Sequence, residues 1–336
     1  MFIIMPIKNC ELYQNMNRTL CIAPMLDWTD RHYRYFMRLI SKNCMLYTEM
    51  INAKAILHSD PHRLLDHDAS ENPLTLQLGG NDPVELASCA KIAQDFGYDE
   101  VNLNVGCPSD RVQSGAFGLC LMKTPDIVAD CIIAMKEAVN IPISIKCRIG
   151  YDNHDSYEAL HHFIDTIVKA DIDFICIHAR KGWLKGLSPK ENRTIPELNY
   201  QTVYDIKKNF SNTSIGINGG IETLEQTQEH LNYVDSVMLG RAAYHNPYSL
   251  IQADKLLYND KSSLILSPFE VVEKMYPYIE KQLSEGIRLN HITRHILGTF
   301  QGMPGARAFR RHLSENSSKK GAGLTVLDES LVYVKR

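Results

Sequence analysis

The stretch LTLQLGGNDPVELASCAKIAQDFGYDEVNLNV, residues 74–105, contains a complete strand–helix–strand unit. Residues 74–79 and 100–105 are short, largely apolar runs bounded by Pro, Asp and Gly, which is typical of strands covered on both faces. Residues 83–97 have helical periodicity, with Asp82 and Pro83 at the start and Gly97 at the end. This unit predicts a parallel sheet covered by helices.

The same unit recurs along the chain. Further strands are predicted at residues 20–24, 45–49, 143–148, 174–179, 214–219 and 236–241, with helices between them, for example at 125–139 and 156–170. Eight such units over about 230 residues predict an α/β fold of the TIM (β/α)8 barrel type. A doubly wound sheet is the alternative, but it rarely needs eight units, and no GxGxxG follows the first strand.

The pattern changes after about residue 255. Residues 267–286 and 289–300 read as helices, with no further strand, so a boundary is expected within residues 259–266. We therefore expect an N-terminal extension outside the core (1–19), a catalytic barrel (20–258) and a small all-helical C-terminal domain (259–336).

Composition indicates an ordinary globular protein, with 44% hydrophobic and 22% charged residues. The apolar run at the N-terminus is too short for a signal peptide, and no stretch reaches transmembrane length, so we expect a cytoplasmic protein without a membrane partner. The nine cysteines lie at least eleven positions apart, which argues against CxxC ligand pairs and for free thiols.

Charge is distributed unevenly. The formal net charge is -3, yet residues 180–193 hold five basic residues against one acidic residue, and residues 287–320 hold seven against one. Such basic regions either bind phosphate backbones or are solvated helix faces, and charge alone does not separate the two.

Polar residues stand where the predicted strands end. Because active sites of TIM barrels lie at the C-terminal ends of the strands, this pattern predicts a site there. Cys107 follows the fourth strand, between Gly106 and Pro108. A buried cysteine is usually a packing residue, but an accessible thiol at the mouth is protonated at neutral pH and can act as a general acid.

Glycines follow the last two strands, in NGGI (218–221) and GRAA (240–243). They either make tight turns only, or let backbone amides approach an anion at the usual phosphate site of this barrel. Arg241 favours the phosphate site, because it adds a positive charge there.

Lys146 lies near the end of the fifth strand. Such a lysine can form a Schiff base, pair with a phosphate or carboxylate, or lie against a cofactor ring. With Gln77 and His178 it forms a plausible hydrogen-bonding cage for a planar heterocycle that carries a phosphate, which fits FMN. His291 and His295 have ligand-like spacing, but basic neighbours and the missing glutamate of HExxH lead us to expect no metal.

Taken together, several short segments closely resemble the flavin-dependent tRNA-dihydrouridine synthases (Dus). They are APMLDWTD (23–30), QLGG (77–80), NLNVGCPS (102–109), KCRIG (146–150), IHAR (177–180), NGGI (218–221) and GRAA (240–243). KGWLKGLSPKENR (181–193) and PGARAFRRHLSE (304–315) resemble the A-type branch, whose members act in the D-loop at positions 20 and 20a.

The resemblance implies a TIM barrel with a helical tRNA-binding domain, FMN as cofactor, NADPH or NADH as reductant, and tRNA as substrate; we expect a monomer. It implies FMN contacts at Pro24, Met25, Leu26, Gln77, Lys146, His178, Asn218, Gly219, Gly220, Gly240 and Arg241. It implies RNA contacts at Asn104, Lys190, Arg193, Arg307 and Arg310. Hydride would pass from reduced FMN to C6 of uracil, and Cys107 would protonate C5.

Three alternatives remain open at this point. A flavin barrel of the dihydropyrimidine or dihydroorotate dehydrogenase type would share the phosphate site and the lysine, but it would not need a basic helical domain. A non-catalytic RNA-binding barrel would carry no flavin. An aldolase would form a Schiff base at Lys146.

Overall fold

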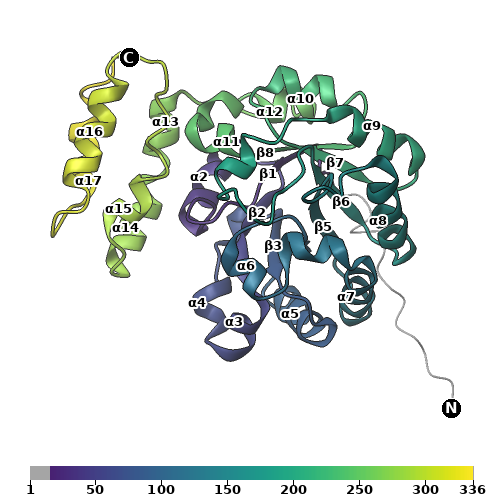
Figure 1. Ribbon diagram of the computed structural model, residues 1–336. Coiled ribbons are helices and arrows are strands. Elements are labelled where there is room, and N and C mark those ends of the chain that lie inside the picture. Colours follow the sequence, from purple (N-terminus) through teal and green to yellow (C-terminus); the bar gives the residue numbers. More distant parts are fainter. Residues whose placement is uncertain (1–15, 336) are drawn as a thin grey trace.

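The computed structural model describes residues 16–335 and contains eight parallel strands in one sheet (Figure 1). The strands pair in the order β1-β8-β7-β6-β5-β4-β3-β2. They are β1 (Leu20–Ile22), β2 (Leu46–Asn52), β3 (Leu74–Gly79), β4 (Glu100–Asn104), β5 (Ile143–Arg148), β6 (Phe174–His178), β7 (Ile215–Asn218) and β8 (Ser236–Leu239).

The first two strands close the sheet on itself. The Ile22 amide donates to the Met45 carbonyl at 2.9 Å, and the Met45 amide donates to the Leu20 carbonyl at 2.9 Å. The prediction of a TIM barrel is therefore confirmed, and the doubly wound alternative is wrong.

Helices surround the strands (Figure 1). The longer ones are α2 (Arg31–Ile40), α5 (Pro83–Asp95), α7 (Pro125–Ala138), α8 (Tyr157–Lys169), α9 (Tyr200–Asn209) and α10 (Leu224–His230). Shorter elements are α3 (Ala53–His58), α4 (Pro61–Leu65), η1 (Ala69–Glu71), α6 (Asp110–Ser114), η2 (Gly118–Lys123), η3 (Glu191–Arg193), α11 (Arg241–His245), η4 (Pro247–Leu250) and α12 (Ala253–Leu257).

Helix α5 shows why the sequence signals worked. The Asp82 carboxylate accepts hydrogen bonds from the amides of Val84 and Glu85 at 2.9 and 3.0 Å, which caps the first turn. Pro83 has no amide proton, but this costs nothing in the first turn of a helix, where backbone amides have no partner within the helix. After the last turn, Gly97 adopts a positive φ of 84°, which a residue with a side chain rarely adopts.

Two kinds of side chain fill the barrel interior. One part holds a buried apolar cluster, whose members are Cys21, Ala23, Met45, Tyr47, Phe174, Cys176 and Met238. Another part holds buried polar side chains of β3, β4 and β5, among them Gln77, Glu100, Asn102 and Ser144. Since buried polar groups are costly unless they are hydrogen-bonded, this second set must form a connected network.

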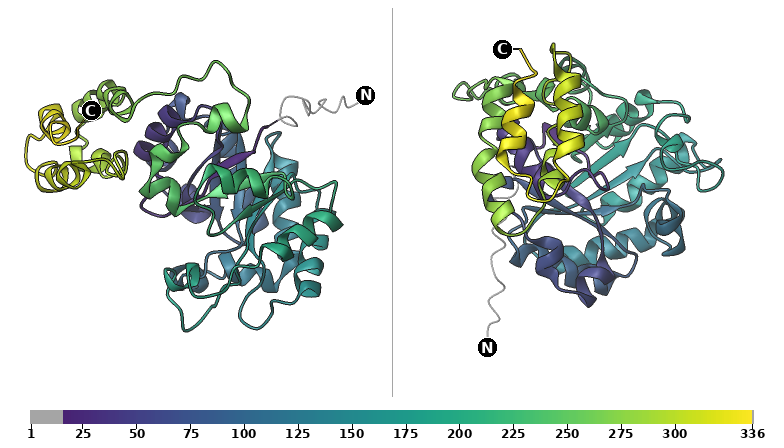
Figure 2. Two further views of the ribbon diagram at one scale, coloured as in Figure 1. Left: turned by 90° about the horizontal axis from the view of Figure 1, so that it is seen from above. Right: turned by 90° about the vertical axis from the view of Figure 1, so that its left-hand side faces the viewer.

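The chain after α12 forms a separate group of helices beside the barrel (Figures 1 and 2). These helices are α13 (Pro268–Glu273), α14 (Tyr276–Ser284), α15 (Leu289–Thr293), α16 (Ala306–Asn316) and α17 (Leu324–Leu331). The helix predicted over 267–286 is divided into α13 and α14, because Pro277 in the first turn of α14 has no amide to continue the ladder. The helix predicted over 289–300 ends at Thr293 and continues as turns.

This group of helices contacts the barrel at α2. The Asp30 carboxylate, which caps α2, accepts from Arg294 and lies 3.0 Å from Nε2 of His295. On the same helix, Nδ1 of His32 lies 2.7 Å from the Tyr278 hydroxyl. Because α2 follows the loop after β1, its first turn lies at the mouth of the barrel, so the helical group joins the barrel at the rim of that mouth.

The contact at His32 predicts a dependence of stability on pH. Burial, aided by the positive charges of His295 and Arg294, lowers the pKa of His32 from 6.5 to about 4. On acidification, His32 therefore takes up a proton near pH 6.5 in the unfolded chain, but only near pH 4 in the folded chain. Stability should fall as the pH falls through this window, by up to about 3 kcal/mol.

Urea unfolding of the wild type and of His32→Gln between pH 4 and 7.5 measures this effect. The difference in unfolding free energy between the two proteins isolates the contribution of His32 from that of other titrating groups. The wild type should lose more stability than the variant on acidification. Equal losses would show that His32 is not the group responsible.

Two further expectations concern the start of the chain and the membrane. Residues 1–15 of the expected extension lie outside the described residues; within the described part, Arg18 forms an ion pair with Glu100 at 2.6 Å and so contacts the barrel core. In residues 16–335, no helix is long and apolar enough to cross a membrane.

Candidate active site

The Cys107 loop is fastened directly beyond β4. Oδ1 of Asn104 accepts hydrogen bonds from the amides of Gly106 and Cys107, at 3.1 and 2.9 Å. The Cys107 carbonyl accepts from the Leu119 amide at 2.9 Å. Gly118 has a φ of 66°, and a Cβ there would lie 2.7 Å from the Cys107 carbonyl oxygen, so the close approach requires glycine. The backbone of Cys107 is therefore fixed from two sides.

The thiol of Cys107 is half-buried, unlike the thiols on β1, β5 and β6, which are buried. Its Sγ lies 3.4 Å from the Ser109 hydroxyl. The Cys107 side chain is thus partly exposed, and a hydroxyl lies beside its sulfur. This arrangement suits a thiol that exchanges a proton with a bound molecule.

Lys146 and Asn218 are brought together across the mouth. Nζ of Lys146 donates to Oδ1 of Asn218 at 2.9 Å, and Nδ2 of Asn218 donates to the Met238 carbonyl at 2.7 Å. Burial lowers the pKa of Lys146. The ammonium retains two further donors for a ligand.

His178 presents a polar atom that lacks a partner. Nδ1 of its imidazole is buried and has no hydrogen-bond partner among the described residues. Burial, with the charges of Arg148 and Lys146, holds the pKa of His178 well below its usual value, so the ring is neutral at pH 7. An unpaired buried nitrogen is costly, and a ligand at the mouth would remove that cost.

The glycine loop after β7 is shaped for a close approach. Gly219 and Gly220 have φ values of 120° and 71°, where a side chain would be strained. Their amides donate to no backbone acceptor in the described part of the chain, and the Gly219 carbonyl accepts from the Tyr200 hydroxyl at 2.7 Å. Free amides in this conformation form an anion-binding concavity.

The loop after β1 meets the loop after β8. A Cβ on Gly240 would lie 3.7 Å from Sδ of Met25, so the two predicted flavin contacts are neighbours. Pro24 is half-buried beside Met25, while the Leu26 side chain is 69% exposed. Arg241 is exposed and donates to the Arg193 carbonyl at 3.4 Å.

Five cations gather at the mouth without a compensating carboxylate; they are Lys146, Arg148, Arg180, Arg193 and Arg241. None of them forms an ion pair within residues 16–335. Burial, with repulsion from Arg193 and Arg180, lowers the pKa of Arg148 to about 10, and burial with Arg241 lowers that of Arg180. Unpaired cations around a barrel mouth, with Arg148 buried among them, indicate a site for an anion.

Arg148 and Arg180 are not among the site residues predicted from the sequence. The structure gives Arg148 a larger role, because its guanidinium donates to the carbonyls of Gly106, Lys181 and Asn192 at 2.9, 3.0 and 3.1 Å. These carbonyls belong to the loops after β4 and β6. Nothing in the local sequence identifies such partners.

Gln77 and Asn104 use much of their hydrogen-bonding capacity inside the protein. Nε2 of Gln77 donates to Asn102 at 2.8 Å, and Oε1 of Gln77 accepts from Asn104 at 2.9 Å. Each amide keeps one proton for a ligand. The sequence suggested Gln77 as a direct ligand contact, whereas the structure also makes it a link between β4 and the mouth.

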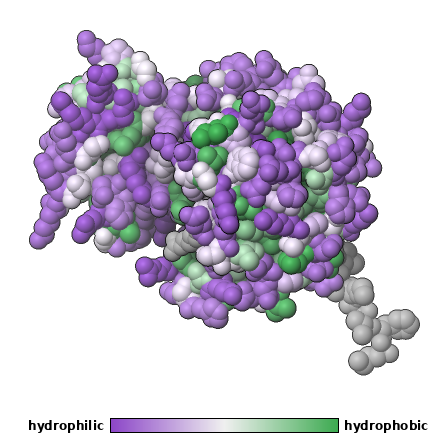
Figure 3. All heavy atoms as spheres, in the orientation of Figure 1, coloured by the Kyte–Doolittle hydropathy of each residue, from purple (hydrophilic) through white to green (hydrophobic). Residues whose placement is uncertain are grey.

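The residues predicted to contact RNA lie in three places. Asn104 is 8% exposed beneath the Cys107 loop. On the barrel, Lys190 directly before η3 and Arg193 at its end are exposed. Arg307 is exposed and Arg310 half-buried on α16, where Arg310 donates to Gln301 at 3.1 Å. Figure 3 shows a mainly hydrophilic surface over these C-terminal helices.

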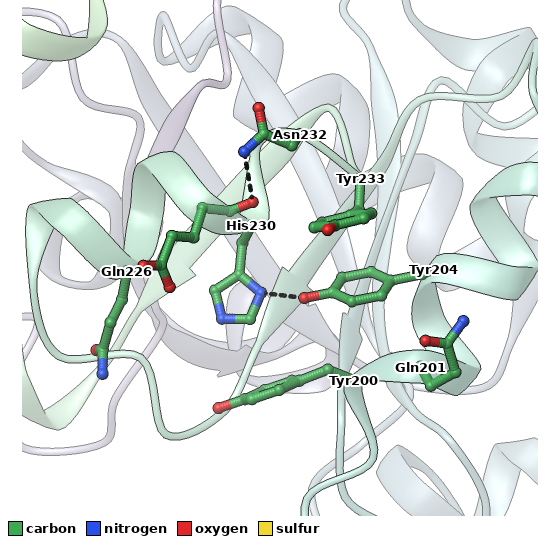
Figure 4. A pocket seen from close by; sticks show the side chains of 8 residues that line it. Tyr200, Gln201, Tyr204, Gln226, His230, Asn232 and Tyr233 are labelled. Atoms are coloured by element: carbon green, nitrogen blue, oxygen red, sulfur yellow. Dashed lines mark hydrogen bonds between the residues drawn. The ribbon is translucent and has the colours of Figure 1, made fainter.

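A separate hollow of about 500 Å³ lies between α9 and α10 (Figure 4). Its lining residues are Tyr200, Gln201, Tyr204, Gln226, Glu229, His230, Asn232 and Tyr233. Nδ1 of His230 lies 2.7 Å from the Tyr204 hydroxyl, and the rings of Tyr204 and Tyr233 stack at 4.4 Å. It holds none of the predicted site residues and no cation, so it is not the site at the mouth.

The pair His291 and His295 shows no metal site. Both ring nitrogens of His295 are engaged, Nε2 with Asp30 at 3.0 Å and Nδ1 with the Tyr244 hydroxyl at 3.2 Å. In the described residues, no group of three His, Cys, Asp or Glu side chains could hold a metal ion.

Fold and site together define a TIM barrel whose mouth, at the C-terminal ends of the strands, is lined by cations and a half-buried thiol. The chain belongs to the dihydrouridine synthase (Dus) family, whose sequence model matches residues 21–334. This match confirms the resemblance found in the sequence.

Curated relatives agree over almost the whole chain. A protein of Shewanella oneidensis named tRNA-dihydrouridine(20/20a) synthase is 58% identical over 320 residues, which cover 95% of each chain. Proteins of the same name from Vibrio vulnificus and Synechocystis sp. are each 55% identical, over 316 and 312 residues. These matches cover 94% and 93% of this chain, and 96% and 93% of the relatives.

Proposed function

We propose that this chain reduces uridine to 5,6-dihydrouridine in the D-loop of tRNA, at positions 20 and 20a. Family membership and the shared name of relatives aligned over nearly their full length support this function. The observation that carries it is the thiol of Cys107, held half-buried at a cationic barrel mouth. The dehydrogenase alternative accounts for the mouth but not for the basic helices beyond it.

The cofactor we propose is FMN, with NADPH or NADH as reductant. The residues present fit a phosphorylated planar ligand, since the mouth offers unpaired amides at Gly219 and Gly220 and an unpartnered nitrogen on His178. The residues that would hold FMN are Pro24, Met25, Leu26, Gln77, Lys146, His178, Asn218, Gly219, Gly220, Gly240 and Arg241. When bound, the flavin supplies the hydride that reduces the C5–C6 bond of uracil.

The chain itself supplies the proton and the electrostatic environment. Cys107 would hold a proton on Sγ and deliver it to C5 of the uracil, because a thiol releases its proton far more readily than a hydroxyl. Lys146 would contribute a positive charge at the mouth that stabilises a negatively charged ligand there. Neutral His178 can pair with a ligand without adding a further buried charge.

The RNA would lie across the mouth and the neighbouring helices. A uracil within a folded RNA must be splayed out to reach the barrel interior. We propose residues 259–336 as the tRNA-binding domain of a monomer, with Arg307 and Arg310 on α16 and Lys190 and Arg193 on the barrel contacting phosphates. Its contact with α2 at the rim supports this assignment, because one RNA could then touch both parts. A cytoplasmic location is consistent with this substrate.

The direct test is reduction of tRNA by the purified protein. Incubation with unmodified tRNA, FMN and NADPH should yield dihydrouridine at positions 20 and 20a, detected by nucleoside mass spectrometry and primer-extension mapping. Reduction of free uracil or orotate but not of tRNA would favour the small-molecule alternative. A colourless protein that binds tRNA would favour the non-catalytic one.

Charge reversal at Arg307 tests the RNA surface. Arg307→Glu should weaken tRNA binding and reduce the slope of log K against log salt by about 1, because one phosphate contact is lost. Flavin content and oxidation of the bound flavin should stay unchanged. Lys208→Glu, at an exposed position of α9, is the matched control and should leave tRNA binding unaltered. Loss of flavin in Arg307→Glu would contradict the proposed division of the chain.

A further inference from the structure

A line of hydrogen-bonded side chains crosses the barrel interior and ends at the Cys107 loop. Glu100, Asn102 and Asn104 alternate along β4, and all three are buried. Ser144 of β5 and Gln77 of β3 are the neighbours of Asn102 in the sheet register. Four side-chain hydrogen bonds of 2.5 to 2.9 Å join Glu100, Ser144, Asn102, Gln77 and Asn104 in that order.

At the Glu100 end of this line, the direction of the hydrogen bonds is fixed. Glu100 is an acceptor that Arg18 holds in an ion pair at 2.6 Å. The single proton of the Ser144 hydroxyl therefore goes to Glu100, at 2.5 Å. The Ser144 oxygen is left to accept from Nδ2 of Asn102, at 2.8 Å. The Asn102 amide must therefore turn its NH2 to Ser144 and its oxygen to Gln77.

At the Asn104 end, the direction of the hydrogen bonds is fixed independently, and it is the same. The amides of Gly106 and Cys107 can only donate, so Asn104 must turn its oxygen to them and its NH2 to Gln77. Gln77 must then turn its NH2 to Asn102. The two ends agree. Reversal of any one amide would place two donors or two acceptors against each other in a dry interior, where such a mismatch is expensive.

We propose that Glu100 is a positioning residue for Cys107: by accepting the hydrogen bond of the Ser144 hydroxyl, it sets the direction of the hydrogen bonds that orient Gln77 and Asn104 and hold the Cys107 backbone at the mouth. Glu100 touches no residue of the mouth itself. The inference rests on the proposed function only where it predicts turnover, because the orientation of the Cys107 loop is a property of the chain alone.

In Glu100→Gln, the two ends of this line of hydrogen bonds require opposite orientations of the amides between them. The guanidinium of Arg18 keeps the oxygen of the new amide, so its NH2 faces the hydroxyls of Ser144 and Tyr47, both of which donate to Oε1 of Glu100 in the wild type. The Ser144 proton then turns to Asn102 or stays without an acceptor. If it turns, the amides of Asn102 and Gln77 and finally Asn104 reverse, and the Asn104 NH2 meets the Cys107 amide. Turnover should fall by roughly 100-fold, the cost of misplacing a catalytic group by about 1 Å.

Ser144→Ala separates positioning from stability. It leaves the ion pair between Arg18 and Glu100 intact and only disconnects the Glu100 end, so turnover should fall less than in Glu100→Gln. In the double variant, the new amide at position 100 no longer reaches Asn102. The double variant should therefore recover to the turnover of Ser144→Ala, although its stability is lower than that of either single variant. A purely structural role of Glu100 predicts the opposite, further loss.

Thr75→Val is the matched control. Thr75 is the register neighbour of Glu100 on β3, is fully buried, and has a hydroxyl without a partner. Removing this hydroxyl from the same layer of the barrel should leave turnover at the wild-type value. A loss equal to that of Ser144→Ala would overturn the proposal.

The decisive readout does not need turnover. The rate at which iodoacetamide alkylates Cys107, followed by peptide mass spectrometry without tRNA, reports the position of the thiol. It should change in Glu100→Gln and return to the Ser144→Ala rate in the double variant. Additive changes, or no change in Ser144→Ala relative to Thr75→Val, would overturn the inference. If the wild type forms no dihydrouridine, the proposed function fails, and the order of the alkylation rates still decides the inference.

Discussion

Cys107→Ala is expected to lose reduction of tRNA by about 10²- to 10⁴-fold, the usual contribution of a general acid, while flavin and tRNA binding persist. The reason is that the thiol is half-buried on the loop that Asn104 fastens over the mouth, and it is a far stronger acid than the neighbouring Ser109 hydroxyl. The Cys107 backbone carries the contacts that hold this loop, so alanine preserves them.

Two comparisons sharpen this prediction. Cys107→Ser keeps the shape and a hydrogen-bonding hydroxyl, but a hydroxyl is a far weaker acid, so this variant should be about as inactive as Cys107→Ala. Cys120→Ala removes the other half-buried thiol in the described part of the chain and should keep full activity. Dihydrouridine formed in a single turnover of pre-reduced enzyme is the measurement. Full activity in Cys107→Ala would remove the proposed acid.

The strands of the barrel could be predicted because each one is marked locally. Every predicted run coincides with an observed strand to within a few residues, since a short apolar segment followed by a polar residue or glycine is how a covered parallel strand ends. Helix α5 was equally legible, because its cap and its terminating glycine are adjacent in sequence. These signals need no knowledge of distant contacts.

The C-terminal helices were harder to predict, because their limits depend on single residues and on packing. Pro277 divides the segment 267–286, a break that the apolar periodicity alone conceals. The segment after Thr293 has helical periodicity, yet it continues as turns, and the next helix starts only at Ala306. There Gly305, with a φ of 90°, packs against the Tyr333 carbonyl, a contact between residues far apart in sequence.

The site divides in the same way. Cys107 lies in a distinctive local segment, and the glycines after β7 indicate that a ligand can approach the backbone closely. Both features could therefore be identified from the sequence. The polar line from Glu100 to Asn104 could not, because it alternates between three strands whose register only the closed barrel supplies. The role of Arg148 was hidden for the same reason: its acceptors are backbone carbonyls, which carry no residue-type signal.

Arg148→Lys is expected to lower turnover by roughly 100-fold, although it keeps the charge. The Arg148 guanidinium binds the Gly106 carbonyl through Nε and the carbonyls of Lys181 and Asn192 through Nη1. It therefore ties the Cys107 loop to the loop after β6. A single ammonium on a flexible stem cannot reproduce this fork. Its pKa of about 10, lowered chiefly by burial, still leaves Arg148 charged at pH 7.

The control for this change is a second buried arginine. Arg38, in the last turn of α2, is also buried and also donates to backbone carbonyls, among them those of Cys44 and Glu71. Arg38→Lys should therefore lower the unfolding free energy as Arg148→Lys does, without the loss of turnover. If the two variants lose turnover in proportion to stability, Arg148 acts on the fold alone. If only Arg148→Lys loses turnover and alters the alkylation rate of Cys107, the arginine holds the acid in place.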